Sequence, residues 1–126
     1  MNSVSELSFG SFIVAKRKDR GMPAAQLAVA LGISPVYMCD IEKGRKHALS
    51  KVVLDKLANI LMLTEAETEL MYDLIAVSQK SISADLPEYI MKHEVVRTAL
   101  RTAKKNDIPD EKWDMFINYI KQDESE

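Results

Sequence analysis

The chain is poor in the residue types that build disulfide frameworks and metal sites. Its 126 residues include one cysteine and two histidines. A single cysteine excludes an intramolecular disulfide, and His47 and His93 lie too far apart to match the spacing of zinc ligands. We therefore expect no metal, no cofactor and a reducing, cytoplasmic environment.

Long hydrophobic runs and catalytic motifs are missing as well. No run approaches the roughly 18 apolar residues that cross a bilayer, and the N-terminus lacks the basic and apolar segments of a secretory signal. The sequence contains no glycine-rich phosphate loop, paired-carboxylate site or histidine-activated nucleophile. With 47% hydrophobic and 29% charged residues, it predicts a globular protein that is neither an enzyme nor a membrane protein.

The net charge of −2 conceals an uneven distribution. Residues 1–50 carry seven Lys or Arg against four Asp or Glu, whereas residues 51–126 carry ten against fifteen. An acidic chain is, as a whole, a poor candidate for nucleic-acid binding. The basic residues of the first half, however, gather at positions 16–20 and 43–47, and clusters of this kind attract phosphate.

Residues 23–45 have the pattern of two short helices joined by a tight turn. In the first helix, Leu27, Ala28 and Leu31 form an apolar stripe. Gly32 suits the left-handed conformation that ends a helix. The pair Ser34–Pro35 then supplies an N-cap and a first helical residue that needs no N–H partner. The sequence therefore predicts a helix-turn-helix.

The same segment resembles the XRE class of phage-repressor and Cro-type regulators. The resemblance rests on Leu-Ala at 27–28, Leu-Gly-Ile-Ser at 31–34 and Asp-Ile-Glu-Lys-Gly-Arg at 40–45, which occur together at the spacing of that class. It extends from about residue 9 to residue 75. It implies a five-helix bundle that binds double-stranded DNA as a homodimer and acts more often as a repressor than as an activator.

We expect an all-α fold with two parts. Residues 1–77 form the helix-turn-helix domain, 78–84 a polar linker, and 85–126 a helical tail similar to those of short bacterial or prophage regulators. In the domain, further helices are expected at about 5–20 and 50–62 and from the capping box at 64–67 onward. In the tail, Asp85 is expected to cap a helix, or a pair of short helices, that reaches about residue 105, and a last helix follows at 110–122.

The exposed face of the second helix of the helix-turn-helix is expected to enter the major groove of DNA. The residues expected to face the bases are Pro35, Val36, Cys39, Asp40 and Lys43. Phosphate contacts are expected from the backbone amides near Ala24, which open the first helix of the motif. Further phosphate contacts are expected from Tyr37 on the second helix and from side chains of the basic clusters: Arg17, Lys18, Arg20, Arg45, Lys46 and His47.

The resemblance to the XRE class carries two further implications. Arg17 is expected to pair with Glu42 and so to fix the first helix of the domain against the recognition helix. Ala24 and Pro35 stand where repressors of this class often carry glutamine, which would hold a phosphate or pair with adenine. Neither alanine nor proline can make those contacts.

Base reading is therefore expected to depend on other side chains of the same helix. Val36 would contact thymine methyl groups, and Asp40 would accept a hydrogen bond from a cytosine amine. Lys43 or Arg45 would contact guanine or phosphate.

The tail carries more apolar side chains than a segment of about 42 residues can bury by itself. They are expected to form a dimer or partner interface that includes Tyr89, Ile90, Leu100, Trp113, Phe116 and Ile120. Three functions remain open from the sequence. The first is a dimeric transcriptional regulator. The second is an antitoxin-type or adaptor protein whose tail binds a partner protein and whose DNA binding is autoregulatory, and the third is a bundle that binds protein alone.

Overall fold

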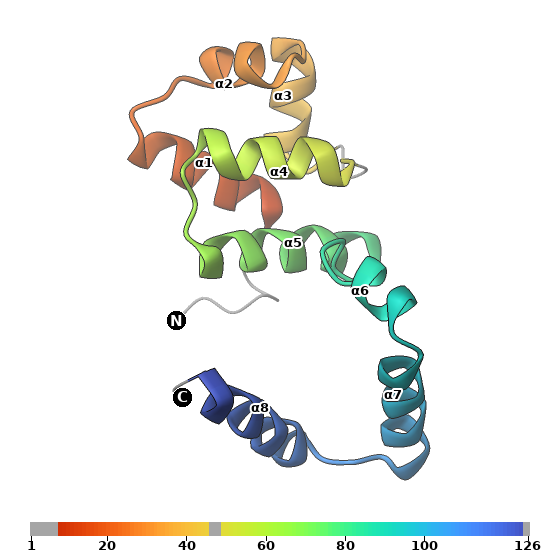
Figure 1. Cartoon of the computed structure of the whole chain (residues 1–126). Coiled ribbons are helices and arrows are strands. Elements are labelled where there is room, and N and C mark those ends of the chain that lie inside the picture. Colours follow the sequence, from red (N-terminus) through yellow and green to blue (C-terminus); the bar gives the residue numbers. More distant parts are fainter. Residues whose placement is uncertain (1–7, 46–48, 125–126) are drawn as a thin grey trace. The chain divides into compact units, whose positions relative to one another are not determined.

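The computed structural model describes residues 8–45 and 49–124, and within these ranges the chain forms eight α-helices and no strand (Figure 1). This confirms the predicted all-α fold class. The helices are α1 (Phe9–Asp19), α2 (Ala24–Leu31), α3 (Pro35–Glu42), α4 (Lys51–Ile60), α5 (Glu65–Gln79), α6 (Pro87–Lys92), α7 (Glu94–Asn106) and α8 (Asp110–Glu124). None of these helices is by itself long and apolar enough to cross a membrane, and only α2 and α3 counted together across their bend meet that description.

Hydroxyl side chains cap the beginnings of α1, α3, α4 and α5. The Ser8 side chain accepts a hydrogen bond from the backbone N–H of Ser11, and Ser11 returns the contact, so α1 starts at Phe9. The expectation of a start near residue 5 placed that helix too early, because the hydrophobic pattern alone does not reveal a Ser–Ser capping box. The predicted Thr64–Glu67 capping box is present at the start of α5.

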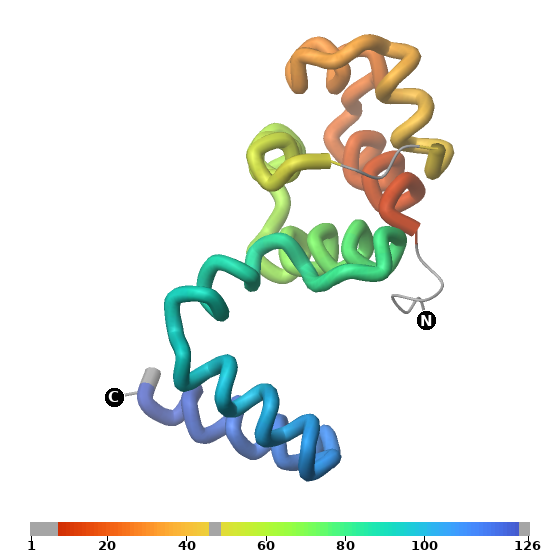
Figure 2. Tube along the Cα trace, turned by 90° about the vertical axis from the view of Figure 1, so that its right-hand side faces the viewer, coloured from red at the N-terminus to blue at the C-terminus, as the bar shows by residue number. Residues whose placement is uncertain are grey.

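The hydrophobic core lies among α1 to α5. α1 packs against α2, α3 and α5, and α2 also packs against α3 and α4 (Figure 2). The side chains with essentially no exposure come from all five helices and from the residue after α4: Ile13, Leu27, Met38, Ile41, Leu54, Leu57, Leu61 and Met71. In α3 and along α4 these residues are three or four positions apart, as the predicted 3.6-residue period requires.

The chain divides into two compact units, Met1–Pro87 and Glu88–Glu126. The segment expected to be a linker, 78–84, belongs to the first unit. Ser78 and Gln79 complete α5, the Ser83 hydroxyl donates a hydrogen bond to the carboxylate of Asp73, and Ala84 packs against the core. α6 begins at Pro87, two residues after Asp85, so Asp85 does not directly precede this helix.

The second unit consists of helices α6, α7 and α8, which carry many exposed apolar side chains. α6 and α7 contain no buried residue. The guanidinium of Arg97 donates hydrogen bonds to the carbonyls of Ile90, at 2.9 Å, and Met91, at 2.6 Å, and so ties the end of α6 to α7. α7 ends at Asp107, which takes the left-handed conformation before the turn to α8.

Candidate nucleic-acid interface

α2 and α3 form a steep two-helix corner. Gly32 ends α2 in the left-handed conformation, with φ of 76°, as the sequence predicted. The backbone N–H of Ile33 then donates to the carbonyl of Ala28 at 3.0 Å and closes the turn. Ser34 caps α3 by accepting a hydrogen bond from the backbone N–H of Tyr37 at 3.0 Å. The chain bends by 111° between the two helices, within the range of a helix-turn-helix.

α3 has one buried face and one open face. Met38 and Ile41 are each 1% exposed and anchor the helix in the core. On the opposite face Val36 is 72% exposed, and Pro35 and Cys39 are exposed as well. An apolar side chain as exposed as Val36 on a rigid helix is available for contact with a ligand.

Three charged groups complete this open face toward the C-terminal end of α3. Lys43 is exposed, and no described residue pairs with its ammonium group. The guanidinium of Arg45 lies 3.4 Å from the carboxylate of Asp40, and the backbone N–H of Arg45 donates to the Asp40 carbonyl at 2.8 Å. The carboxylate of Asp40 is therefore placed beside a cation instead of standing alone on the surface.

Arg17 and Glu42 form the ion pair expected from the sequence. Nε and Nη2 of Arg17 donate to the two carboxylate oxygens of Glu42, at 2.8 and 3.1 Å, and Nη1 donates to the carbonyl of Met22 at 3.2 Å. The two side chains are only 13% and 12% exposed. The hydrogen bonds that Arg17 donates to Glu42 raise the pKa of Arg17 above its ordinary value, against the opposing effect of burial. The pair fixes the orientation of α3 relative to α1.

A close backbone approach supports the same junction. A Cβ atom on Gly10 would lie 2.8 Å from the carbonyl carbon of Glu42 and would overlap its oxygen. Sequence reasoning did not identify Gly10, because a glycine inside a helix does not reveal which distant part of the chain lies against it. Its position between Phe9 and the buried Phe12 on the core-facing side of α1 is the signal that could have identified it.

The N-terminal end of α2 differs from those of α1, α3, α4 and α5. Its N-cap residue is Pro23, which makes no side-chain capping hydrogen bond, whereas Ser8, Ser34, Ser50 and Thr64 cap the other four helices. The first backbone amides of α2 are therefore open to an external acceptor. The small side chain of Ala24, which packs partly on the core, permits an anion to come close.

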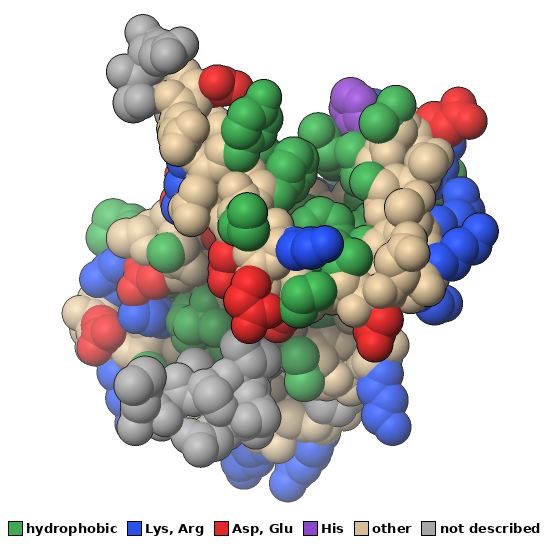
Figure 3. All heavy atoms as spheres, turned by 90° about the horizontal axis from the view of Figure 1, so that it is seen from below, with side chains coloured by type: hydrophobic (Ala, Val, Ile, Leu, Met, Phe, Trp, Pro, Cys, Tyr) green, Lys and Arg blue, Asp and Glu red, His purple; other side chains and the backbone are tan. Residues whose placement is uncertain are grey.

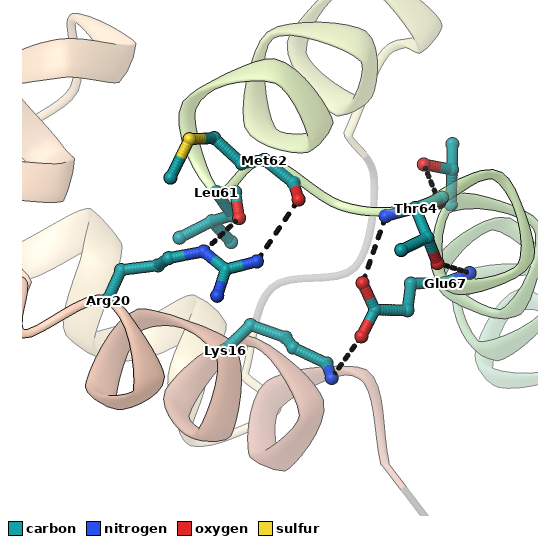
Figure 4. Close-up of polar contacts among 7 residues, drawn as sticks. Lys16, Arg20, Leu61, Met62, Thr64 and Glu67 are labelled. Carbon is teal, nitrogen blue, oxygen red and sulfur yellow. Dashed lines mark hydrogen bonds and ion pairs between the residues drawn. The ribbon is translucent and has the colours of Figure 1, made fainter.

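Two side chains of the first basic cluster, 16–20, have structural roles between α1 and the α4–α5 turn (Figure 4). Lys16 pairs with the carboxylate of Glu67. Arg20, which was expected to contact phosphate, donates to the carbonyls of Leu61 and Met62 at 2.9 and 3.1 Å. The orphan carbonyls at the end of α4 thus hold this guanidinium. Lys18 is exposed, and its ammonium group forms no ion pair with a described residue.

The pair formed by Lys16 and Glu67 also changes the titration of the carboxylate. Glu67 accepts the hydrogen bond from Lys16 and another from the backbone N–H of Thr64. Together these contacts lower the pKa of Glu67 from 4.5 to about 2. The stability that this ion pair gives to the contact between α1 and α5 therefore depends on pH.

The remaining expected site residues fall in three places. The side chain of Tyr37 packs partly against the core, so less of it is available than expected for a phosphate contact. Lys46 and His47 lie outside the described residues. Tyr89, Leu100, Phe116 and Ile120 are 57, 42, 50 and 46% exposed, and Ile90 and Trp113 are partly exposed.

No group of His, Cys, Asp or Glu side chains in the described part of the chain is arranged to hold a metal ion.

Comparison with protein-family models matches residues 8–71 to the helix-turn-helix domain. The match spans half of the sequence, and the chain belongs to this DNA-binding family, in agreement with its XRE-class motifs. A search of curated proteins finds no match. Among solved structures, one described as the SinR protein/SinI protein complex is 21% identical, with coverage of 94% of this chain and 99% of that chain and a TM-score of 0.43.

Proposed function

We propose that the protein is a sequence-specific transcriptional regulator that binds double-stranded DNA as a homodimer and acts as a repressor. In this proposal the first unit, residues 1–87, binds DNA, with α3 in the major groove, and the helices of the second unit, from residue 88 onward, make the dimer. The proposal is supported by membership of the helix-turn-helix family and by the charge pattern of the first half of the chain.

The open face of α3 is the observation that carries the proposal. Val36, at 72% exposure, extends from a helix whose first residues are capped by Ser34 and whose last residue, Glu42, is held by Arg17. A rigid exposed helix with an apolar centre and cations at its end suits contact with base edges and flanking phosphates.

The chemistry of the same face assigns a role to each group. Val36 contacts thymine methyl groups, and Asp40 accepts a hydrogen bond from a cytosine amine while Arg45 neutralises its repulsion from phosphate. Lys43 binds phosphate or guanine. The open amides at the start of α2 hold a second phosphate, through the helix dipole and without any side chain.

A homodimer follows from the way in which helix-turn-helix proteins read DNA. A single α3 reads only a few base pairs, so two copies are needed to read two half-sites that lie one helical turn apart. The exposed apolar residues of the tail, among them Leu100 and Phe116, support its role as the dimer contact.

The test is the salt dependence of duplex binding, measured by fluorescence anisotropy. If each half-site neutralises three or four phosphates, the slope of log K against log salt is roughly −5 to −7 for the dimer. Replacement of both Lys43 and Arg45 by alanine should flatten the slope and weaken binding to all sequences. Lys80→Ala, at the end of α5, is the matched control and should leave the slope unchanged.

Each alternative function has its own outcome in this experiment. An unchanged slope in the Lys43/Arg45 variant, or no binding at all, would contradict the proposal and favour a bundle that binds protein alone. Salt-dependent DNA binding by a chain that is purified with a second small protein in place of a homodimer would favour the antitoxin-type or adaptor interpretation.

A further inference from the structure

The tail presents two apolar stripes that stay partly exposed in the described part of the chain. They have the same spacing of three, one and three residues along their helices. The α7 stripe is Val96, Ala99, Leu100 and Ala103, and the α8 stripe is Trp113, Phe116, Ile117 and Ile120. Leu100 is 42% exposed and Phe116 is 50% exposed, so the two helices of one chain do not bury each other's stripes. Stripes of this kind are the contact surfaces of helical bundles.

An open groove lies between the two stripes. It has a volume of about 580 Å³. Its α7 wall combines the small residues Ala99 and Ala103 with Thr102 and Asn106. Ile108 and Pro109 line it at the turn, and Lys112 and Trp113 line it on α8. Trp113 packs edge-to-face with Phe116 at 6.3 Å between ring centroids. In Figure 3, hydrophobic side chains lie on both sides of a hollow in this face of the molecule. Small residues on one wall leave room for bulky apolar side chains from outside.

The charges beside the two stripes have opposite signs. Arg101, Lys104 and Lys105 lie on α7, and Asp110, Glu111 and Asp114 lie on the first turns of α8. None of these six side chains forms an ion pair within the described part of the chain, although both signs are present in one hairpin. α7 therefore offers an apolar stripe beside cations, and α8 offers an apolar stripe beside anions.

We propose that two copies of the chain pair through their tails with α7 of each copy packed on α8 of the other. This inference rests on the homodimer of the proposed function and specifies its contact. A second copy fits because it brings an acidic α8 to the basic α7 and, by the twofold symmetry, a basic α7 to the acidic α8. Phe116 and Ile120 of one copy then enter the groove beside Ala99 and Ala103 of the other.

Charge reversal in the full-length chain tests this contact. One variant carries Arg101→Glu and Lys105→Glu on α7, and the other carries Asp110→Lys and Asp114→Lys on α8. Each variant alone places like charges against each other twice, which should raise the dimer dissociation constant about 100-fold or more. An equimolar mixture should form a heterodimer with near wild-type affinity, detected by native mass spectrometry, because both contacts again join opposite charges. Lys56→Glu with Lys80→Glu is the control and should dimerise as the wild type does.

The other outcomes overturn different parts of the account. If both variants dimerise like the wild type, or if neither dimerises and the mixture forms no heterodimer, the pairing of α7 with α8 across the dimer is wrong. If the wild-type chain itself is a monomer, the homodimer of the proposed function is also wrong, and the stripes belong to a different protein partner. Circular dichroism of each variant establishes that its helices are intact.

Discussion

Gly10 of α1 lies against the backbone of Glu42 at the end of α3, closer than any other residue type would permit. A Cβ atom at position 10 would lie 2.8 Å from the Glu42 carbonyl carbon, and the neighbour is backbone, which cannot rotate away. The same Glu42 binds Arg17 through both of its carboxylate oxygens. α3 is therefore held to α1 by one steric and one ionic contact at the same residue.

Replacement of Gly10 by alanine should destabilise the protein. Glycine to alanine inside a helix ordinarily stabilises by about 0.4–1 kcal/mol. Here the added methyl group must force α1 and α3 apart, which costs about 1–3 kcal/mol. Urea denaturation measures the sign of the change. Ala15→Gly, at an exposed position of the same helix, is the control and should cost about 1 kcal/mol. A stabilised Gly10→Ala variant would show that the two backbones are not in contact.

Removal of either partner of the Arg17–Glu42 pair should cost about 3 kcal/mol, because the remaining charge is left in a site with little exposure. The double variant should lose less than the sum of the two single losses. A double-mutant cycle by chemical denaturation measures this coupling. The Lys92–Glu88 pair, whose side chains are 68 and 74% exposed, provides the control cycle and should show little coupling. Additive losses for Arg17 and Glu42 would contradict the pairing.

Stability should fall in acid partly through Glu67. Its pKa is lowered from 4.5 to about 2 in the folded chain, chiefly by Lys16. The charged carboxylate therefore stabilises the fold fully above pH 4.5, and this contribution is lost as the pH falls toward about 2. Urea midpoints between pH 6 and pH 2 should fall more steeply for the wild type than for Glu67→Gln. Parallel curves would mean that Glu67 titrates alike in the folded and unfolded chains.

A chain that ends at Pro87 should remain a folded bundle but become monomeric and bind DNA weakly. The cut preserves the contact of Ser83 with Asp73 and the packing of Ala84, which an earlier cut would remove. Light scattering gives the oligomeric state, and anisotropy gives the affinity. A truncated chain that is still dimeric and binds with full affinity would show that the tail does not make the dimer.

The sequence predicted the fold well where local chemistry decides the structure. Gly32, Ser34 and the Thr64–Glu67 box set helix ends through contacts within a few residues, and each has the predicted role. The apolar stripes of α2 to α5 also follow from periodicity. The Arg17–Glu42 pair required more than periodicity, since the residues are 25 positions apart, and only the family resemblance suggested it.

The contacts that individual cations and Gly10 make with distant residues could not be predicted in the same way. Arg20 was assigned to phosphate because it belongs to a basic cluster. The carbonyls at the end of α4, which are distant in sequence, also bind it, and the sequence did not predict that contact. The approach of Gly10 to Glu42 likewise depends on how two helices cross. Such contacts are properties of the packed structure, whereas a cluster of like charges shows only where positive potential is concentrated.

The selection of DNA from a random pool by the purified full-length protein tests the central claim most directly. The account predicts enrichment of an inverted repeat whose half-sites lie about 10 base pairs apart, centre to centre, with thymines where Val36 meets the groove. The variant Val36→Ala should lose the preference for those thymines, and their replacement by uracil, which lacks the methyl group, should weaken binding of the wild type. A pool that shows no enriched sequence after selection at moderate salt would contradict the claim that α3 reads DNA.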